Sequence, residues 1–498
     1  MTRAAKAAAQ TPQARLASVI KSSRDIMRKD AGLNGDLDRL PQLSWLLFLK
    51  AFDDLEQNRM IVDPGYRPAL PEELRWSAWA ADPTTRKQGD ALINWVNGTL
   101  LPGLGRLKGS GQAGDPRTTL GSVFKEANNR MLSGYLLGDL IDQIDKVHFT
   151  SADDIHTMAH LYESMLREMR DAAGDSGEFY TPRPVIRLMV EQVDPRLGET
   201  VLDPAVGTGG FLVEAYEHLR AQAKSATQIA KAKSSIIGFE KKPLPYLLCQ
   251  MNLLLHEVEQ PNVTRTNSLT FALADQRKAG VDVVLTNPPF GGEEESSSLD
   301  NFPADSRTSE TAWLFLQVVM ARLEKNKGRC GIVVPNGVLF ANEGAPARIK
   351  KKLLTEFNLH TVVRLPNGVF APYTLIPSNL LFFEYGGPTK DIWFYEQPLP
   401  EGRKNYTKTN PLRYEEFADL TEWWGGHDQT GRVENEHAWK VDAATLADDG
   451  YNLDLRNPHR TDDLAHRSPE DLVKELIVVE EEILAALRDL QSELRSDG

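Results

Sequence analysis

The 498-residue chain is predicted to have an α/β fold, with a helical domain before an open twisted sheet and a helical tail after it. Three observations predict this. Residues 14 to about 165 carry apolar side chains at helical spacing. From about Gly174, short apolar runs alternate with helical patterns, which indicates βαβ units with parallel strands. From Pro469 on, apolar residues recur at steps of four and three, as on one face of a helix.

These patterns divide the chain into consecutive segments. We expect a disordered lead-in at 1–13, a helical N-terminal domain at 14–170, a sheet domain at 171–400 and an extension packed on the core at 401–466, followed by a helix at 467–498. The expected strands are 200–202, 236–239, 281–285, 331–335, 359–365 and 379–384. The expected helices between them are 210–222, 245–256, 311–323 and 345–357. Trp423, Trp424, Trp439 and Tyr451 are expected to pack the extension onto the body.

Composition excludes several classes of protein. The net charge of −13 argues against a protein that coats nucleic acid by bulk electrostatics, although a local basic patch or a partner could supply phosphate contacts. Apolar stretches stay below the ~18 residues that span a bilayer, and the first 13 residues lack the apolar core of a signal peptide. Cys249 and Cys330 are expected to be buried thiols of a cytoplasmic protein, and no metal site is predicted.

The first glycine cluster follows the first expected strand. Asp203 to Phe211 reads DPAVGTGGF, and its glycines would let a ligand approach the backbone closely. The spacing is not that of G-x-G-x-x-G, and no G-x-x-x-x-G-K-[ST] occurs. By itself, a glycine cluster of this kind usually marks only a tight turn from strand to helix.

The ends of the next strands add polar side chains. Glu240 ends the second strand, where a carboxylate holds the ribose diol in Rossmann-like sheets. Alone, Glu240 would be read as a surface charge beside Lys241 and Lys242. Asn267 and Ser268 follow a third expected strand, which lies between the strands 236–239 and 281–285. Successive strand ends would therefore surround a nucleoside cofactor.

The most informative segment is Asn287-Pro288-Pro289-Phe290, which follows the fourth strand. Proline removes a ladder donor and fixes φ, so the strand must end in a stiff loop. The amide of Asn287 can accept from an exocyclic amine, and the ring of Phe290 can stack on a base. An isolated string of this kind is as often a simple turn. The polar run 291–307 that follows is expected to be a mobile loop that orders on DNA, or a solvated linker.

Together these segments resemble the gamma class of DNA amino-methyltransferases, most closely the modification subunits of type I restriction–modification systems. Gly177 to Arg183, GEFYTPR, resembles the family's cofactor segment, Asp203 to Gly209 its glycine motif and Asn287 to Phe290 its catalytic motif, in the gamma order. Where the family often has DPACGTGG, Val206 replaces the cysteine. Further likeness lies in 328–340, 364–370 and 451–454, so it covers nearly the whole chain.

The resemblance implies a Rossmann-like S-adenosylmethionine-dependent methyltransferase sheet and methyl transfer from S-adenosyl-L-methionine to N6 of adenine in DNA. The catalytic residues it implies are Asn287, Pro288, Pro289 and Phe290. The cofactor-binding residues it implies are Glu178, Phe179, Tyr180, Thr181, Asp203, Gly207, Thr208, Gly209, Glu240, Asn267 and Ser268. Acceptors on Asn287 and the Pro288 carbonyl would orient the amine, and Phe290 would stack on the extruded adenine.

The resemblance also implies partners. A separate specificity subunit would read the DNA, with two modification subunits per complex, and a restriction subunit is a further expected partner. The helix at 467–498 would contact the partner subunit or, alternatively, the surface of its own protein. A methyltransferase that acts on RNA or on a protein amide, a stand-alone DNA methyltransferase and N4-cytosine methylation remain open. An idle scaffold and a dinucleotide oxidoreductase fit the motifs less well.

Overall fold

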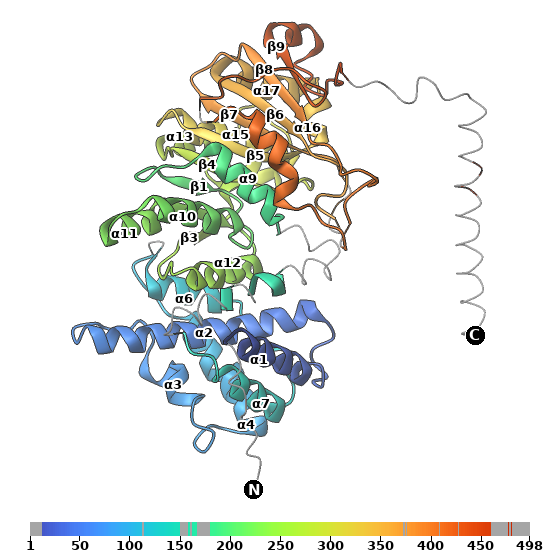
Figure 1. Ribbon diagram of the computed structural model, residues 1–498. Coiled ribbons are helices and arrows are strands. Elements are labelled where there is room, and N and C mark those ends of the chain that lie inside the picture. The colour runs from blue at the N-terminus through green and yellow to red at the C-terminus, as the bar shows by residue number, and fades with distance from the viewer. Residues whose placement is uncertain are drawn as a thin grey trace.

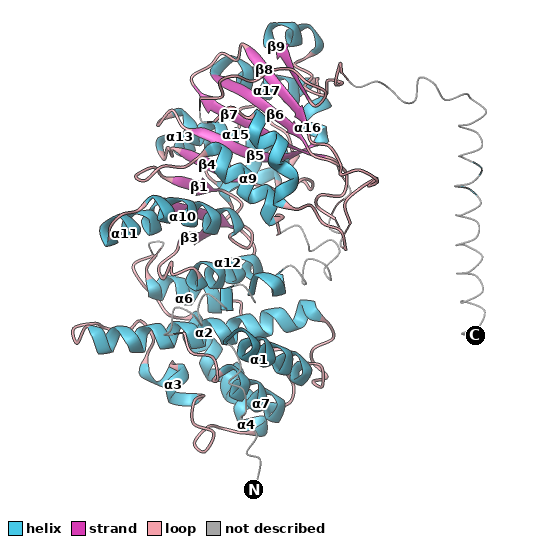
Figure 2. Ribbon diagram, viewed as in Figure 1, coloured by secondary structure: helices cyan, strands magenta, loops and turns pink. Residues whose placement is uncertain are grey.

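The computed structural model has a helical region at one end and a sheet flanked by helices at the other (Figures 1 and 2). It describes residues 12–111, 114–149, 158–159, 162–166, 180–371, 374, 376–407, 409–426, 428–459, 477 and 480. Three sequence predictions therefore fall wholly or mostly outside the described residues: the lead-in, the cofactor residues Glu178 and Phe179, and the C-terminal helix.

Every regular element described before Val201 is helical, as predicted. These elements are α1 (Pro12–Met27), α2 (Asp36–Val62), η1 (Glu72–Leu74), α3 (Trp76–Trp79), α4 (Gly89–Trp95), the π-helical η2 (Val96–Leu100), α5 (Leu101–Gly105), α6 (Pro116–Phe124), α7 (Gly134–Ile144) and α9 (Arg183–Val193). Side-chain caps define two of the starts: Asp115 accepts from the backbone of α6, and Ser133 from that of α7.

Helix α2 is the spine of the helical region. Its middle, from Leu43 to Asp53, is buried at every position, because other helices pack around it on several sides. Near its end, the buried Glu56 carboxylate accepts the backbone N–H groups of Ala69 at 2.6 Å and Leu70 at 3.1 Å, which fixes the loop that follows. Helix α12 (Pro243–Leu255), which belongs to the sheet region, packs against α2 and joins the two regions.

The sheet has nine strands in the order β3-β2-β1-β4-β5-β7-β6-β8-β9. Their bounds are β1 (Val201–Asp203), β2 (Ile236–Glu240), β3 (Asn262–Arg265), β4 (Val283–Thr286), β5 (Arg329–Pro335), β6 (Phe357–Arg364), β7 (Ser378–Tyr385), β8 (Asp391–Glu396) and β9 (Ala438–Asp442). The pairs from β3 to β5 are parallel, as predicted. The prediction of parallel strands is wrong for β7, which runs antiparallel to both β5 and β6, and β9 is antiparallel to β8.

Helices cover both faces of this sheet, so the strands are buried on two sides. Alternate residues of β4 show this: Val283 and Leu285 pack with the core under α9 and α10, whereas Val284 packs with the core under α15 and α17. The remaining helices are α10 (Gly210–Gln222), α11 (Ala226–Ser235), η4 (Ser268–Thr270), α13 (Leu273–Lys278), α14 (Ser296–Leu299), α15 (Thr311–Glu324), α16 (Asn336–Phe340), α17 (Gly344–Glu356), η5 (Tyr414–Phe417), α18 (Ala418–Trp423) and η6 (Ala443–Asp449).

The extension after β8 packs on the core through aromatic side chains, as predicted. Trp424 and Trp439 are each 2% exposed, and Trp439 stacks on Phe394 of β8 with ring centroids 5.3 Å apart. The guanidinium of Arg432 lies 4.7 Å from the Trp423 ring centroid and 4.6 Å from that of Trp424. The extension also contributes β9, so it completes the sheet edge.

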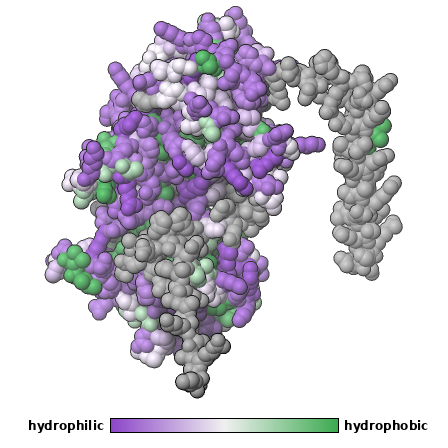
Figure 3. Space-filling view, in the orientation of Figure 1, coloured by the Kyte–Doolittle hydropathy of each residue, from purple (hydrophilic) through white to green (hydrophobic). Residues whose placement is uncertain are grey.

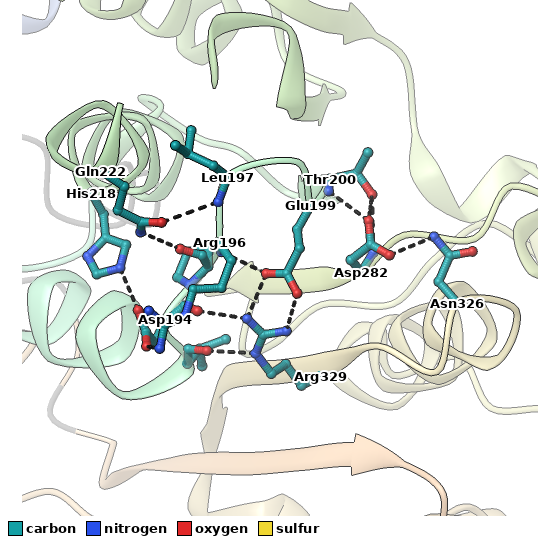
Figure 4. A network of polar contacts seen from close by, with 12 residues as sticks. Asp194, Arg196, Leu197, Glu199, Thr200, His218, Gln222, Asp282, Asn326 and Arg329 are labelled. Carbon is teal, nitrogen blue, oxygen red and sulfur yellow. Dashed lines mark hydrogen bonds and ion pairs between the residues drawn. The ribbon is translucent and has the colours of Figure 1, made fainter. Parts of the chain in front are cut away.

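At the amino ends of the central strands, a polar network ties the loops together (Figure 4). Arg329 at the start of β5 makes a bidentate ion pair with Glu199 and donates to the backbone carbonyls of Val193 and Asp194 at 2.7 Å. Asp282 accepts from the backbone and hydroxyl of Thr200, both at 2.8 Å. This network lies at the edge of the sheet opposite to the carboxyl ends of β1 and β4.

The visible face of the molecule is mostly hydrophilic, with apolar residues in small, separate patches (Figure 3). Among the described residues, none of the helices is both long enough and apolar enough to cross a membrane. Both cysteines are buried free thiols, as predicted.

Candidate active site

The carboxyl ends of β1, β2, β3 and β4 surround a cavity of about 310 Å³, within the usual size range of small-molecule sites. Predicted site residues in its wall are Thr181, Asp203, Gly207, Thr208, Glu240, Asn267, Ser268, Asn287 and Pro289. Tyr180, Gly209, Pro288 and Phe290 are close in sequence to these residues but are not part of the wall. The sequence prediction thus named strand ends that the fold brings together from more than 100 residues of chain.

The glycine turn after β1 adopts a backbone that requires glycine. Gly207 has φ 53° and Gly209 has φ 84°, both in the left-handed region. A Cβ on Gly209 would lie 3.0 Å from the Sγ atom of the buried Cys249, so space as well as φ favours glycine there. Gly209 stands at the start of α10, and the turn therefore directs the amino end of that helix towards the cavity.

Asp203 fastens this turn to the neighbouring strand. Its Oδ1 atom accepts from the hydroxyl of Thr286 on β4 at 2.7 Å and from the backbone N–H of Ala205 at 3.0 Å. The side chain is buried, and burial raises its pKa to about 7 despite these two hydrogen bonds. Asp203 therefore holds the glycine turn in place.

Glu240 at the end of β2 reaches the same turn. Its two carboxylate oxygens accept the backbone N–H groups of Gly207 at 3.0 Å and Lys242 at 2.8 Å. It is 7% exposed, and burial raises its pKa to about 7, which the two backbone hydrogen bonds partly oppose. The structure excludes the alternative that Glu240 is a surface charge: it is a buried carboxylate in the cavity wall.

Asn267 and Ser268 form the third strand end. The Oδ1 atom of Asn267 accepts from the backbone of Leu269 at 3.0 Å, and its Nδ2 atom donates to Glu294 at 3.1 Å. Ser268 donates its hydroxyl to the Pro204 carbonyl, which joins the ends of β1 and β3. Lys241 and Glu294 also line this part of the cavity and were not predicted.

Asn287 lines the cavity and carries a buried acceptor. Its Nδ2 atom donates to the hydroxyl of Thr181 at 2.9 Å, and its Oδ1 atom is buried with no hydrogen-bond partner among the described residues. A buried carbonyl without a partner costs about 1–3 kcal/mol, so such a group in a pocket points to a ligand that donates to it. The chemistry that suits this atom is an N–H group such as an exocyclic amine.

The residues after Asn287 place one aromatic ring against another. Pro288 is buried, and the Pro289 carbonyl accepts from the hydroxyl of Thr311 at 3.3 Å. The half-buried ring of Phe290 meets the buried ring of Phe370 edge to face, with centroids 5.7 Å apart. Phe370 belongs to the segment 364–370, whose family likeness gave no reason for its place next to Phe290.

An ion pair between Arg183 and Glu163 also supports the cavity wall, and the sequence did not predict it. Arg183 at the start of α9 makes a bidentate ion pair with Glu163 and donates to the Gly210 carbonyl at 3.0 Å. Tyr180 donates its hydroxyl to the same Glu163 carboxylate at 2.8 Å. This arrangement places Tyr180 behind the wall and Thr181 within it. Arg183 lies inside GEFYTPR, so its position in that segment was the available signal.

The donor set is suited to a nucleoside. Among the described residues there is no group of three or more His, Cys, Asp or Glu side chains that could hold a metal ion. A glycine turn, a carboxylate on the next strand and an orphaned amide oxygen fit S-adenosylmethionine beside a base.

The chain is similar to known proteins in both sequence and structure. Residues 153–467 match the family model of the N-6 DNA methylases. The chain is 44% identical over 484 residues to the EcoEI type I methylase subunit of Escherichia coli, covering 96% of this chain and 97% of that one. A chain described as a type I modification subunit from Vibrio vulnificus YJ016 is 51% identical with a TM-score of 0.79, covering 92% of this chain and all of that one.

A chain from a structure on complex assembly and conformational transition of the type I system superposes even better. It is 39% identical with a TM-score of 0.82, covering 98% of this chain and 100% of that chain. Sequence identity, shared length and shared fold thus point to the same family. The chain belongs to the N-6 DNA methylase family, among the methylase subunits of type I restriction enzymes.

Proposed function

We propose that this methyltransferase uses the cavity at the carboxyl ends of β1 to β4 to bind S-adenosyl-L-methionine and to methylate N6 of adenine in DNA. The observation that carries the proposal is the buried Asn287 Oδ1 atom, which has no partner among the described residues. An adenine amine is a donor that would satisfy it. The same geometry would serve the amine of cytosine, and the family relationship favours adenine.

The cofactor-binding roles follow from the contacts of the wall residues. The left-handed turn at Gly207 and Gly209, with Thr208 between them, leaves room for the methionine end against the start of α10. Glu240 would accept hydrogen bonds from the ribose hydroxyls, and Asn267 and Ser268 would lie at the base. Thr181 closes the wall beside Asn287, and we keep Glu178, Phe179 and Tyr180 as proposed neighbours of the cofactor on the strength of the family resemblance.

The catalytic roles belong to the motif after β4. Bound S-adenosylmethionine would supply a methyl group that its sulfonium already activates. Asn287 Oδ1 and the Pro288 carbonyl would accept hydrogen bonds from the two N–H groups of the amine. These bonds would favour a tetrahedral nitrogen whose lone pair points at the methyl group instead of into the ring. Pro289 keeps the loop stiff, and Phe290 would stack on an adenine that has left the duplex. No residue of the chain needs to form a covalent intermediate.

Partners are proposed on the type I relationship. We propose that a specificity subunit supplies sequence recognition, that two methylase subunits join it, and that a restriction subunit can be added. We propose that a helix at 467–498 contacts the specificity subunit, with the helical domain at 14–170 as a second surface. The catalytic domain would then span 171–400, and its extension 401–466. A net charge of −13 supports this division, because the chain is poorly suited to hold DNA alone.

The test is methyl transfer from labelled S-adenosylmethionine to unmethylated genomic DNA, by the chain alone and with its specificity subunit. DNA hydrolysis identifies the labelled base, and Asn287→Ala is the blank. Label on N6-adenine only when the specificity subunit is present supports the proposal. Label with the chain alone would contradict the proposed division of labour, and cofactor binding with no label on DNA would move the substrate to RNA or protein.

A further inference from the structure

Glu294 is a buried carboxylate in the cavity wall that the proposed mechanism does not use. It lies four residues after Phe290, within the run expected to be a mobile loop or a solvated linker, yet its side chain is only 6% exposed. Its backbone N–H donates to the Ser309 carbonyl at 2.9 Å, and the neighbouring Glu293 forms an antiparallel bridge with Glu310. The loop therefore has a defined path that turns Glu294 inwards.

Two side chains from the other strand ends hold this carboxylate. Lys241, just after β2, donates to Oε1 at 3.1 Å, and Asn267, just after β3, donates to Oε2 at 3.1 Å. Burial opposes ionisation of Glu294, but the hydrogen bonds from Lys241 and Asn267 outweigh it and hold its pKa below the usual value. The side chain is thus a fixed, ionised acceptor.

Its position identifies the part of a nucleoside that it would meet. The strand order β3-β2-β1-β4 places the glycine turn, Glu240 and Asn267 at successive strand ends. A cofactor with its methionine end at β1 and its ribose at β2 has its base at β3. Glu294 contacts Asn267 at that third position, so it faces the base. This step rests on the cofactor proposed above.

The pair formed by Asn267 and Glu294 offers a donor beside an acceptor. The Nδ2 atom of Asn267 carries two hydrogens, one of which goes to Glu294, and a carboxylate oxygen can accept more than one hydrogen bond. Adenine presents the matching edge, an acceptor N1 beside a donor N6 amine. Hypoxanthine presents the reverse, a donor N1–H beside an acceptor O6. The Asn267 donor would then face another donor, and the Glu294 acceptor would face another acceptor.

We propose that Glu294, together with Asn267, selects the adenine base of the cofactor by accepting a hydrogen bond from its exocyclic amine, and that Lys241 positions Glu294 for this role. Because Glu294 and the catalytic motif share one loop, occupation of the base site would also steady Asn287 and Phe290. The chain would therefore use two acceptors for two adenines, Glu294 for that of the cofactor and Asn287 for that of DNA.

The test is calorimetric binding of S-adenosylhomocysteine and S-inosylhomocysteine to the full chain, which requires no methyl transfer. The wild type should prefer the adenosyl compound by ~5- to 150-fold, the discrimination expected of a paired donor and acceptor. Glu294→Gln should bind the adenosyl compound ~10-fold more weakly and reduce the preference towards one, because its amide can turn to donate to O6. Glu294→Ala should lose the same preference.

Glu295→Gln is the matched control, since Glu295 is an exposed neighbour outside the cavity wall and should behave as wild type. Thermal unfolding of each variant shows that the fold is kept. An unchanged preference in both Glu294 variants would overturn the inference while leaving the proposed function intact. A wild-type chain that binds neither compound would instead overturn the proposed cofactor site.

Discussion

The side-chain amide of Asn287 donates to the hydroxyl of Thr181 across 2.9 Å, and this bond fixes the orientation of the amide. With Nδ2 engaged, the Oδ1 atom is left buried and without a partner among the described residues. The catalytic loop after β4 and the segment before α9 are 106 residues apart in sequence, and this contact joins them. An acceptor is thus oriented before substrate arrives, which is the preorganisation that transfer reactions require.

Replacing Thr181 with valine should remove that orientation. The valine methyl keeps the volume but cannot accept, so the Asn287 amide can rotate and place its NH2 group in the cavity. We expect kcat to fall about tenfold, corresponding to one lost hydrogen bond of ~1.4 kcal/mol. Steady-state methylation in the presence of the specificity subunit measures it. Thr181→Ser retains the hydroxyl and should stay close to wild type, and equal losses in both variants would argue that bulk rather than the hydrogen bond matters.

Cofactor affinity should increase with pH through the titration of Glu240. Burial raises its pKa to about 7, and ribose hydroxyls donate to the ionised carboxylate, so protonation below that pH opposes binding. We expect the Kd for S-adenosylhomocysteine to fall between pH 6 and 8 by up to ~10-fold per pH unit on the acid side, with protons released on binding. Glu240→Gln should flatten most of this dependence. A wild-type affinity that is constant over this range would contradict the role of Glu240.

The raised pKa of Glu240 should make the free protein less stable as the pH rises, whereas cofactor affinity should increase with pH. Between the ordinary value of 4.5 and about 7, the folded state holds a proton on Glu240 that the unfolded state has released. The contribution of this group to stability is therefore largest at low pH and is lost as the pH rises through about 7. Thermal unfolding of the free chain and of Glu240→Gln across pH 5 to 8 would show whether the difference between them follows this direction.

Phe290→Leu should weaken the productive binding of DNA. The ring is braced edge to face by Phe370, and stacking of a base on an aromatic ring contributes about 1–3 kcal/mol. We expect kcat/KM for DNA to fall by ~5- to 150-fold, with S-adenosylhomocysteine affinity unchanged. Phe290→Tyr keeps the stacking face and should retain most activity. If leucine serves as well as phenylalanine, the ring has a packing role only.

The Arg329 network at the amino ends of the strands should matter for stability alone (Figure 4). Arg329→Met removes a bidentate bond to Glu199 and leaves two backbone carbonyls without donors. We expect a loss of about 2 kcal/mol and a fall of several degrees in Tm, with cofactor affinity unchanged. Arg220→Met, which removes exposed pairs with Glu217 and Glu257, should change Tm little. A weakened cofactor affinity in Arg329→Met would show that the two edges of the sheet are coupled.

The ends of β1 and β4 were predictable because each of these strands is a short apolar run buried on both faces. Val201 to Asp203 and Val283 to Thr286 are buried at every position, so the residues after them had to emerge at one edge of the sheet. The direction of each strand was harder to predict from the sequence. The apolar run of β7 reads the same in either direction, and its antiparallel pairing depends on the loop from Arg364 to Ser378.

Glu294 and Phe370 show a second limit of the sequence. The polar run 291–307 carries the composition of a loop, and nothing local distinguishes Glu294 from its exposed neighbours Glu293 and Glu295. It is buried because Lys241 and Asn267 reach it from strand ends far away in the chain. The place of Phe370 beside Phe290 likewise depends on tertiary packing. Local patterns predicted the positions of the site, and long-range contacts decided its further members.

The central claim is that Asn287 presents the acceptor for the adenine amine. The most direct measurement is single-turnover formation of N6-methyladenine, quantified by mass spectrometry, with wild type and Asn287→Ala in complex with the specificity subunit. S-adenosylhomocysteine binding is measured on the same samples. The account predicts that Asn287→Ala loses methylation by ~100-fold or more while binding S-adenosylhomocysteine within a few-fold of wild type. Methylation by Asn287→Ala at the wild-type rate would contradict it.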